Sequence, residues 1–165
     1  MKLLTYSENN NPSPRFGFKI ENRIVDIRNA AQWISDDQNN DHFLSLPKTL
    51  KESLVNWDQN YSILKQLEDD VINLDINSFS NNESDLVILP PVPDPPAFRD
   101  FYAFEQHVRA ARKLRGLEMN PDWYKIPIFY FSNPNCCYGH GAEIPYPSKT
   151  TELDESHSVS PVVVS

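Results

Sequence analysis

Asp100 and His107 are the residues whose types and spacing best suit acid–base chemistry, and they lie in the segment RDFYAFEQHVRAARKLRG. They are seven positions apart, or about two helical turns, so a helix that begins at Asp100 would turn both side chains to one side, roughly 10 Å apart. On that helix they share a face with apolar residues, opposite most of the charged ones. An imidazole accepts a proton near neutral pH, so His107 is a candidate base.

The same pattern allows two interpretations without catalysis. An aspartate directly before a helix is a favoured N-cap, because its carboxylate accepts hydrogen bonds from the first backbone N–H groups. A histidine on an apolar face is often a hydrogen-bonded core residue. Residues 100–115 predict a helix, ended by Gly116 as a C′ cap, but this pattern does not decide between the roles.

Motifs on both sides of this predicted helix carry a family resemblance. ILPPVPDPPAFRD leads into it, and PDWYKIPIFYFSNPN and PYPSKTTELD follow. In this order the motifs resemble the fumarylacetoacetate hydrolase family. The similarity is good over residues 86–154 and looser over residues 1–85.

The resemblance gives four residues a role. It implies that Asp100, the aspartate of the D-F-Y run, binds a divalent cation and that His107 acts as general base on water. It also implies that Tyr102 and Tyr130 contact the substrate. An ideal helix from Asp100 would turn Tyr102 away from His107, so Tyr102 can contact the same substrate only if the helix begins later.

The reaction implied by this family is a metal-dependent hydrolysis. Oxygen ligands suit Mg²⁺ or Ca²⁺, and such a cation can hold a 2-oxo acid or a 1,3-dicarbonyl acid, for example an acylpyruvate. The imidazole takes a proton from water, hydroxide attacks the carbonyl, and a carbon–carbon bond breaks. The family also contains decarboxylases, isomerases and hydratases, and its members commonly form homodimers.

The resemblance stops after the E-L-D run. In the family this run leads into a strand with an E-x-E pair of metal ligands, whereas this chain reads TELDESHSVSPVVVS. Glu155 is out of register with that pair, and we assign it no metal role. We therefore expect a catalytic segment that is truncated and inactive alone, with any cation bound weakly. The alternative is a non-catalytic binding protein that meets a partner through residues 100–131.

The remaining sequence predicts an α+β fold. The segments KLLTY, RFGFKI and RIVDI indicate an antiparallel β-meander. Helices are expected over residues 29–34 and, from an apolar stripe, from Leu50 onward. Residues 1–85 then form a β-rich module with helices. Prolines within residues 90–96 predict a stiff connector.

The predicted catalytic segment follows that connector. Residues 86–154 are expected to begin a mixed β-roll catalytic domain, with a buried strand at residues 128–131. The chain supplies only the opening strand and helix of that domain. Residues 155–165 form a divergent tail that we expect to be disordered.

Composition limits the partners and the compartment. The net charge is −8 without a Lys/Arg-rich block, which argues against nucleic acid and anionic membranes. The longest apolar run, residues 126–131, is far shorter than the ~20 residues of a membrane span. The N-terminus lacks the apolar stretch of a signal peptide, so we expect a cytoplasmic protein. Cys136 and Cys137 are expected as free thiols, because C-C-x-x-H, ending at His140, is not a structural zinc spacing.

Overall fold

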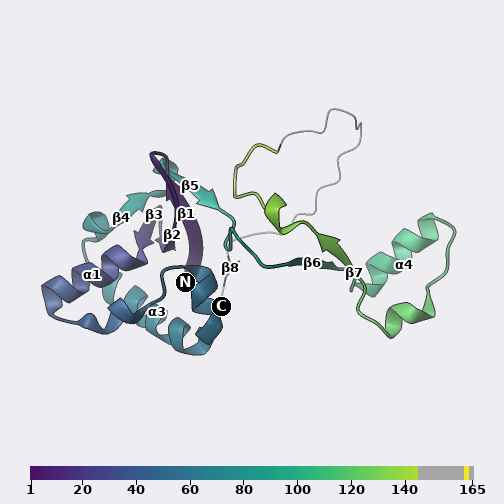
Figure 1. Ribbon diagram of the computed structural model, residues 1–165, viewed down its shortest axis with the longest axis horizontal. Helices are drawn as coiled ribbons and strands as arrows, with labels where there is room; N and C mark the ends of the chain where they lie inside the picture. The colour runs from purple at the N-terminus through teal and green to yellow at the C-terminus, as the bar shows by residue number, and fades with distance from the viewer. Residues whose placement is uncertain (145–161, 164–165) are drawn as a thin grey trace. The chain divides into compact units, whose positions relative to one another are not determined.

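The computed structural model describes residues 1–144 and 162–163 (Figure 1). The chain forms two compact units, which are considered separately below. The first unit contains residues 1–93 and the described residues from 138 onward, and the second contains residues 94–137. Strands and helices occur in both units, so the predicted α+β class is confirmed.

The first unit is built on an antiparallel sheet with the strand order β4-β3-β2-β1-β5. Its first three strands are the predicted meander, in which each short β-rich segment pairs with the next. The strands are β1 (Lys2–Glu8), β2 (Asn11–Ile20), β3 (Arg23–Asp26), β4 (Ser80–Asn82) and β5 (Leu86–Leu89).

Two later segments add to the sheet at β1. Strand β5 pairs with β1, so Leu86–Leu89 belongs to the first unit, and the division falls after residue 93 instead of the expected residue 85. The backbone of β8 (Val162–Val163) also pairs with β1, opposite Lys2 and Leu3. The rest of the tail expected at residues 155–165 lies outside the described residues. No helix or strand occupies residues 90–97, as the proline-rich connector predicts.

Helix α1 (Ile27–Gln38) extends beyond the predicted residues 29–34 on both sides. The carboxylate of Asp26 caps its first turn by accepting from Asn29 N, and Asn39 ends it in the left-handed region at φ 52°. The stripe from Leu50 forms two helices instead of one: α2 (Leu50–Ser53) and α3 (Trp57–Val71).

The interruption between α2 and α3 has a local cause. Asn60 Nδ2 donates a hydrogen bond of 2.9 Å to the carbonyl oxygen of Ser53, and the Ser53 hydroxyl donates to the carbonyl of Thr49. The regular bond from Ser53 N–H to the carbonyl of Thr49 is kept, so α2 ends at Ser53 because its own carbonyl accepts from the Asn60 side chain. Short 3-10 turns complete the chain: Asp41–Ser45, Leu54–Asn56, Ile76–Ser78, Glu83–Asp85, Pro121–Tyr124 and Pro134–Cys136.

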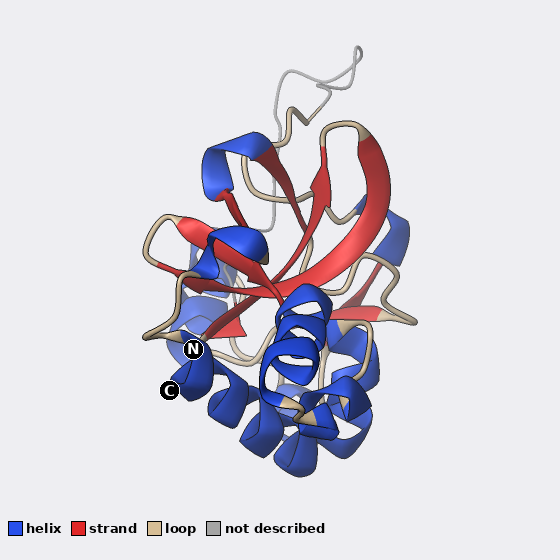
Figure 2. Cartoon of the chain, turned by 90° about the vertical axis from the view of Figure 1, so that its left-hand side faces the viewer, coloured by secondary structure: helices blue, strands red, loops and turns tan. Residues whose placement is uncertain are grey.

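The helices of the first unit cover one face of its sheet (Figures 1 and 2). Successive strand residues point to opposite faces, so Leu3 joins the helix-side core while Leu4 joins a smaller cluster with Tyr6 and Ile24 on the other face. The helix-side core unites strand and helix residues that are almost fully buried, among them Phe18, Val25, Ile34, Leu64 and Leu67.

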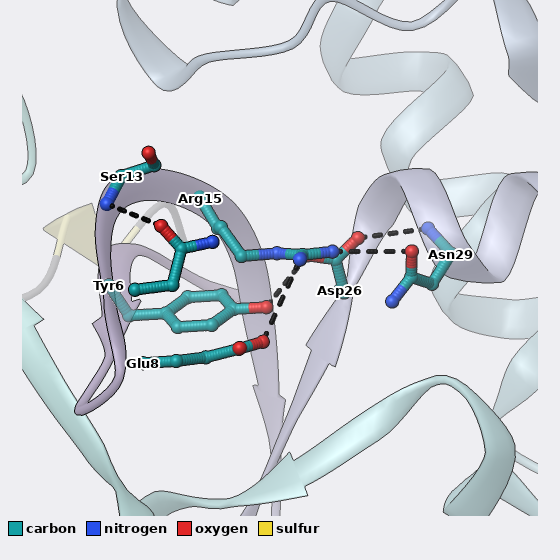
Figure 3. A network of polar contacts seen from close by, with 7 residues as sticks. Tyr6, Glu8, Ser13, Arg15, Asp26 and Asn29 are labelled. Carbon is teal, nitrogen blue, oxygen red and sulfur yellow. Dashed lines mark hydrogen bonds and ion pairs between the residues drawn. The ribbon is translucent and has the colours of Figure 1, made fainter.

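The sheet contains a buried polar network around Asp26 (Figure 3). Tyr6 Oη and Arg15 Nε each donate a hydrogen bond of 2.7 Å to Asp26 Oδ2, while Asp26 Oδ1 caps α1. Burial is the main cause that raises the pKa of Tyr6, and the neighbouring charge of Asp26 adds to it. The hydrogen bond to Asp26 is the main cause that raises the pKa of Arg15. The network therefore holds a neutral phenol against an ion pair.

The second unit consists of a two-stranded antiparallel ribbon and one helix. The ribbon pairs β6 (Phe98–Phe101) with β7 (Phe129–Ser132), and α4 (Glu105–Leu114) follows β6 after three residues. None of the described helices in either unit is long and apolar enough to span a bilayer.

Candidate functional site

Asp100 lies in strand β6, and the prediction of a helix that begins there is wrong. Helix α4 begins at Glu105, and its N-cap is Phe104, which makes no side-chain capping bond, so the N-cap interpretation of Asp100 is wrong as well. The reason is nonlocal. Residues 98–101 satisfy backbone groups by pairing with β7, about thirty residues later in the chain, and local helical spacing does not reveal that partner.

The aromatic face of the ribbon explains why this strand forms. The Arg99 guanidinium lies 4.0 Å from the ring centroid of Phe131, and the rings of Phe101 and Phe129 are 5.3 Å apart. Such cross-strand contacts stabilise an antiparallel ribbon. Since strand side chains alternate, these four residues lie on one face and Asp100 lies on the other.

Helix α4 ends as predicted but buries little. Gly116 has φ 68°, its N–H donates to the carbonyl of Lys113, and Leu117 N–H donates to the carbonyl of Arg112, which is a Schellman cap. The face that the sequence predicts to be apolar is largely exposed to solvent: Leu114 is 90% exposed and Phe104 is 80% exposed. Val108 is the buried residue of this helix.

Asp100 and Tyr130 stand directly opposite each other across the ribbon. Directly opposed residues project from the same face, so the proposed metal ligand and one proposed substrate contact share a surface. Tyr130 is 72% exposed, and its neighbours in β7 are exposed too. Residues 128–131 therefore contain the predicted strand, but the prediction that it is buried is wrong.

Tyr102 and His107 are in ring contact. Their centroids are 6.0 Å apart, with the ring planes at 89°. Tyr102 can face His107 because α4 begins later than Asp100, which is the condition that the sequence analysis set. Tyr102 N–H donates a bond of 3.0 Å to the carbonyl of Ile128, which continues the pairing of the ribbon past β6.

The structure thus links the four predicted site residues in pairs. Tyr130 opposes Asp100, Tyr102 follows Asp100 by two residues, and Tyr102 contacts His107. The side chains of Asp100 and His107 are exposed and come from a strand and a helix, respectively. The group lies on an open surface of the second unit.

The donor set does not by itself form a divalent-cation site. Across residues 1–144 and 162–163, no three His, Cys, Asp or Glu side chains gather closely enough to hold a metal ion. Mg²⁺ and Ca²⁺ take about six or more oxygen ligands, and Asp100 supplies at most two. Cys136 is an exposed free thiol and Cys137 is a half-buried one, as expected.

Glu105, at the start of α4, belongs to an ionic cluster that sequence reasoning missed. Its Oε1 accepts hydrogen bonds from Arg109 Nη2 and from Tyr124 Oη, the latter at 2.8 Å. The bond from Arg109 is the main cause that lowers the pKa of Glu105, and the bond to Glu105 is the main cause that raises the pKa of Tyr124. The spacing of Glu105 and Arg109 predicts an i,i+4 pair, but nothing local indicates Tyr124.

Trp123 is the second residue that sequence reasoning missed. Its indole Nε1 donates a hydrogen bond of 2.8 Å to the carbonyl oxygen of Tyr102, 21 residues earlier. Trp123 also packs edge to face against Tyr124, with centroids 4.9 Å apart. These two aromatic residues therefore contact both Tyr102 and the first residue of α4.

Comparisons with known proteins leave the family open. No protein-family model matches the chain, and no curated protein matches it either.

Proposed function

We propose that this chain derives from the fumarylacetoacetate hydrolase family and carries part of a site for a small 2-oxo or 1,3-dicarbonyl acid. Residues 94–137 would belong to the opening of the family's mixed β-roll catalytic domain. The observation that best supports this proposal is the contact between Tyr102 and His107. A substrate contact and a general base that act on one substrate must lie close together. Tyr102 and His107 do so because α4 begins only at Glu105.

In the proposed reaction His107 acts on water. Its neutral imidazole accepts a proton, and the hydroxide adds to the carbonyl carbon of an acylpyruvate. The carbon–carbon bond then breaks, and the departing carbon takes up a proton, which leaves a carboxylic acid and pyruvate. Tyr102 and Tyr130 would orient the substrate through their hydroxyl groups. Both are suited to this because a phenol can donate and accept hydrogen bonds.

The role of Asp100 in metal binding is a separate part of the proposal. The family resemblance implies Mg²⁺ or Ca²⁺ at this carboxylate, and the described residues of one chain gather no group of three acidic, His or Cys ligands around it. A longer chain or a second copy in a homodimer would be a source of the other oxygen ligands. With Asp100 alone, we expect weak binding and no turnover.

The test is hydrolysis of a simple acylpyruvate by the purified chain with Mg²⁺ present. Turnover that His107→Ala reduces by about 10²-fold or more, while His42→Ala leaves it unchanged, would support catalysis and contradict the expected inactivity of the chain alone. Turnover equal in both variants would exclude His107 as the base. A homodimer seen by sedimentation in the active preparation would identify the source of the missing ligands.

A non-catalytic binding protein is the second candidate, and the exposed side chains of residues 100–131 favour it. Large apolar side chains in this range are unusually open to solvent: Phe104 is 80% exposed and Phe131 is 78% exposed. Clustered exposed apolar residues often mark interaction surfaces. Saturable binding of a purified partner that Phe131→Ser abolishes, in a chain without turnover, would support this function. Val55→Ser, at an exposed apolar residue of the first unit, is the matched control.

A further inference from the structure

The turn at Pro121–Tyr124 holds the chain on both sides of the link that joins β6 to α4. Trp123 Nε1 donates to the carbonyl of Tyr102, which lies at the start of this link. Tyr124 Oη donates to Glu105, the residue that begins α4. His107 follows two residues after Glu105. Adjacent residues of one turn therefore contact both ends of the segment that presents Tyr102 and His107.

The link has little other support. Phe104, the N-cap residue, makes no side-chain capping bond and is 80% exposed. Ala103 is exposed as well. The N–H of Tyr102 donates to Ile128 on the ribbon, whereas its carbonyl accepts the indole hydrogen bond. The carbonyl of Phe104 accepts from Val108 N–H and so belongs to α4, which leaves the indole bond to hold the peptide that follows Tyr102. Loss of that bond would allow α4 to change direction.

Trp123 differs from the other two tryptophans in this respect. Trp33 packs against Phe79 and Trp57 stacks on Tyr61, and all three tryptophans are half-buried. Among the indole N–H groups in the part of the chain that the structure describes, that of Trp123 is the one that donates a hydrogen bond to a protein acceptor. Its bond joins segments 21 residues apart, which is typical of a side chain that fixes tertiary geometry.

We propose that Trp123 and Tyr124 are positioning residues that set the direction of the Tyr102 and His107 rings. The importance of this positioning for catalysis rests on the proposed function. The positioning itself can be observed in a protein without turnover. Neither residue acts on the substrate in this proposal. A small displacement of a catalytic group, of about 1 Å, can cost about 10²-fold in rate, so a residue that holds the base has a measurable effect.

The positioning is tested by NMR of the His107 imidazole protons, whose resonances are shifted by the ring current of Tyr102. Trp123→Phe keeps an aromatic ring but removes the N–H donor. We expect its His107 resonances to move toward those of Tyr102→Leu, which lacks the ring altogether. Trp33→Phe is the matched control and leaves them unchanged. Wild-type resonances in Trp123→Phe would overturn the proposal.

Two further measurements guard against a variant that fails to fold. In the unmodified protein, the indole N–H of Trp123 should exchange with solvent more slowly than those of Trp33 and Trp57; equal exchange would contradict the hydrogen bond. Tyr124→Phe removes one exposed hydroxyl, and a smaller shift of the His107 resonances in the same direction is expected. No shift in that variant would remove Tyr124 from the proposal.

The acylpyruvate assay separates this inference from the proposed function. If the unmodified chain has no turnover, as expected for the chain alone, the NMR results decide the positioning by themselves. If turnover is present but His107→Ala leaves it unchanged, the catalytic proposal fails while the NMR results can still support the positioning. If turnover is present, Trp123→Phe should lower kcat about 10-fold while KM changes less, because the base is displaced. An unchanged kcat in a folded Trp123→Phe protein would contradict positioning of His107.

Discussion

The rings of Tyr102 and His107 meet edge to face, with their planes at 89° and their centroids 6.0 Å apart. This geometry arises because the chain stays extended from β6 through Tyr102 and turns into α4 only at Glu105. The same extended backbone places Asp100 opposite Tyr130. The candidate site therefore depends on where a strand ends and a helix begins.

Tyr102→Phe tests whether the phenolic hydroxyl contacts the substrate. The aromatic ring, and with it the contact to His107, is retained. In a preparation that turns over an acylpyruvate, we expect KM to rise about 10-fold, equivalent to about 1.4 kcal/mol of binding free energy, with a smaller change in kcat. Tyr138→Phe, an exposed tyrosine of the first unit, is the control. Equal KM values for the two variants would exclude a substrate contact by the Tyr102 hydroxyl.

The start of α4 should lose stability in acid because of Glu105. Hydrogen bonds from Arg109 and Tyr124 lower its pKa below the ordinary value of 4.5. A depressed carboxyl pKa contributes stability that is present above the unfolded value and is lost as pH falls through the folded pKa. NMR chemical shifts of α4 amides should therefore change below pH 4.5.

Glu105→Gln should remove that acid transition, since its amide does not titrate. Glu118→Gln is the matched control, because Glu118 lies in the same unit and accepts a hydrogen bond from Arg112 through its backbone carbonyl, not through its carboxylate. An acid transition that persists unchanged in Glu105→Gln would show that another group causes it.

Asp26→Ala should strongly destabilise the first unit. Asp26 is 2% exposed, and its removal leaves Tyr6 Oη and Arg15 Nε without their acceptor and α1 without its cap. Breaking a buried charged network from one side costs about 3–5 kcal/mol in the free energy of unfolding. Urea denaturation measures the loss. Asp37→Ala, an exposed position of α1, should change that free energy by less than about 0.5 kcal/mol.

Gly17→Ala should also destabilise the first unit, for a steric reason. A Cβ at this position would lie 2.6 Å from the carbonyl oxygen of Val25 and 3.1 Å from the ring of Tyr6. The backbone of β3 would have to shift, at a cost of roughly 1–3 kcal/mol in the free energy of unfolding. Ser13→Ala, an exposed position of the same strand, is the control in urea denaturation. Equal midpoints for the two variants would contradict the close approach.

Local patterns in the sequence determined several elements of this protein. Alternating β-rich segments separated by short turns predicted β1, β2 and β3, and neighbouring strands of a meander need no distant partner. Gly116 predicted the end of α4, because a residue without a side chain adopts the left-handed conformation at little cost. The proposed roles of Asp100, Tyr102, His107 and Tyr130 came from a family resemblance, and those roles await experiment.

Tertiary structure decided how those residues meet. Asp100 and Phe101 also fit the helical pattern predicted for residues 100–115, and only pairing with β7 makes them part of a strand. Pairing with β1 places β5 in the first unit, and the indole of Trp123 reaches a carbonyl 21 residues away. Each of these contacts joins residues that are far apart in the sequence and therefore closes a long loop of chain. The residue spacing within either segment does not identify the partner.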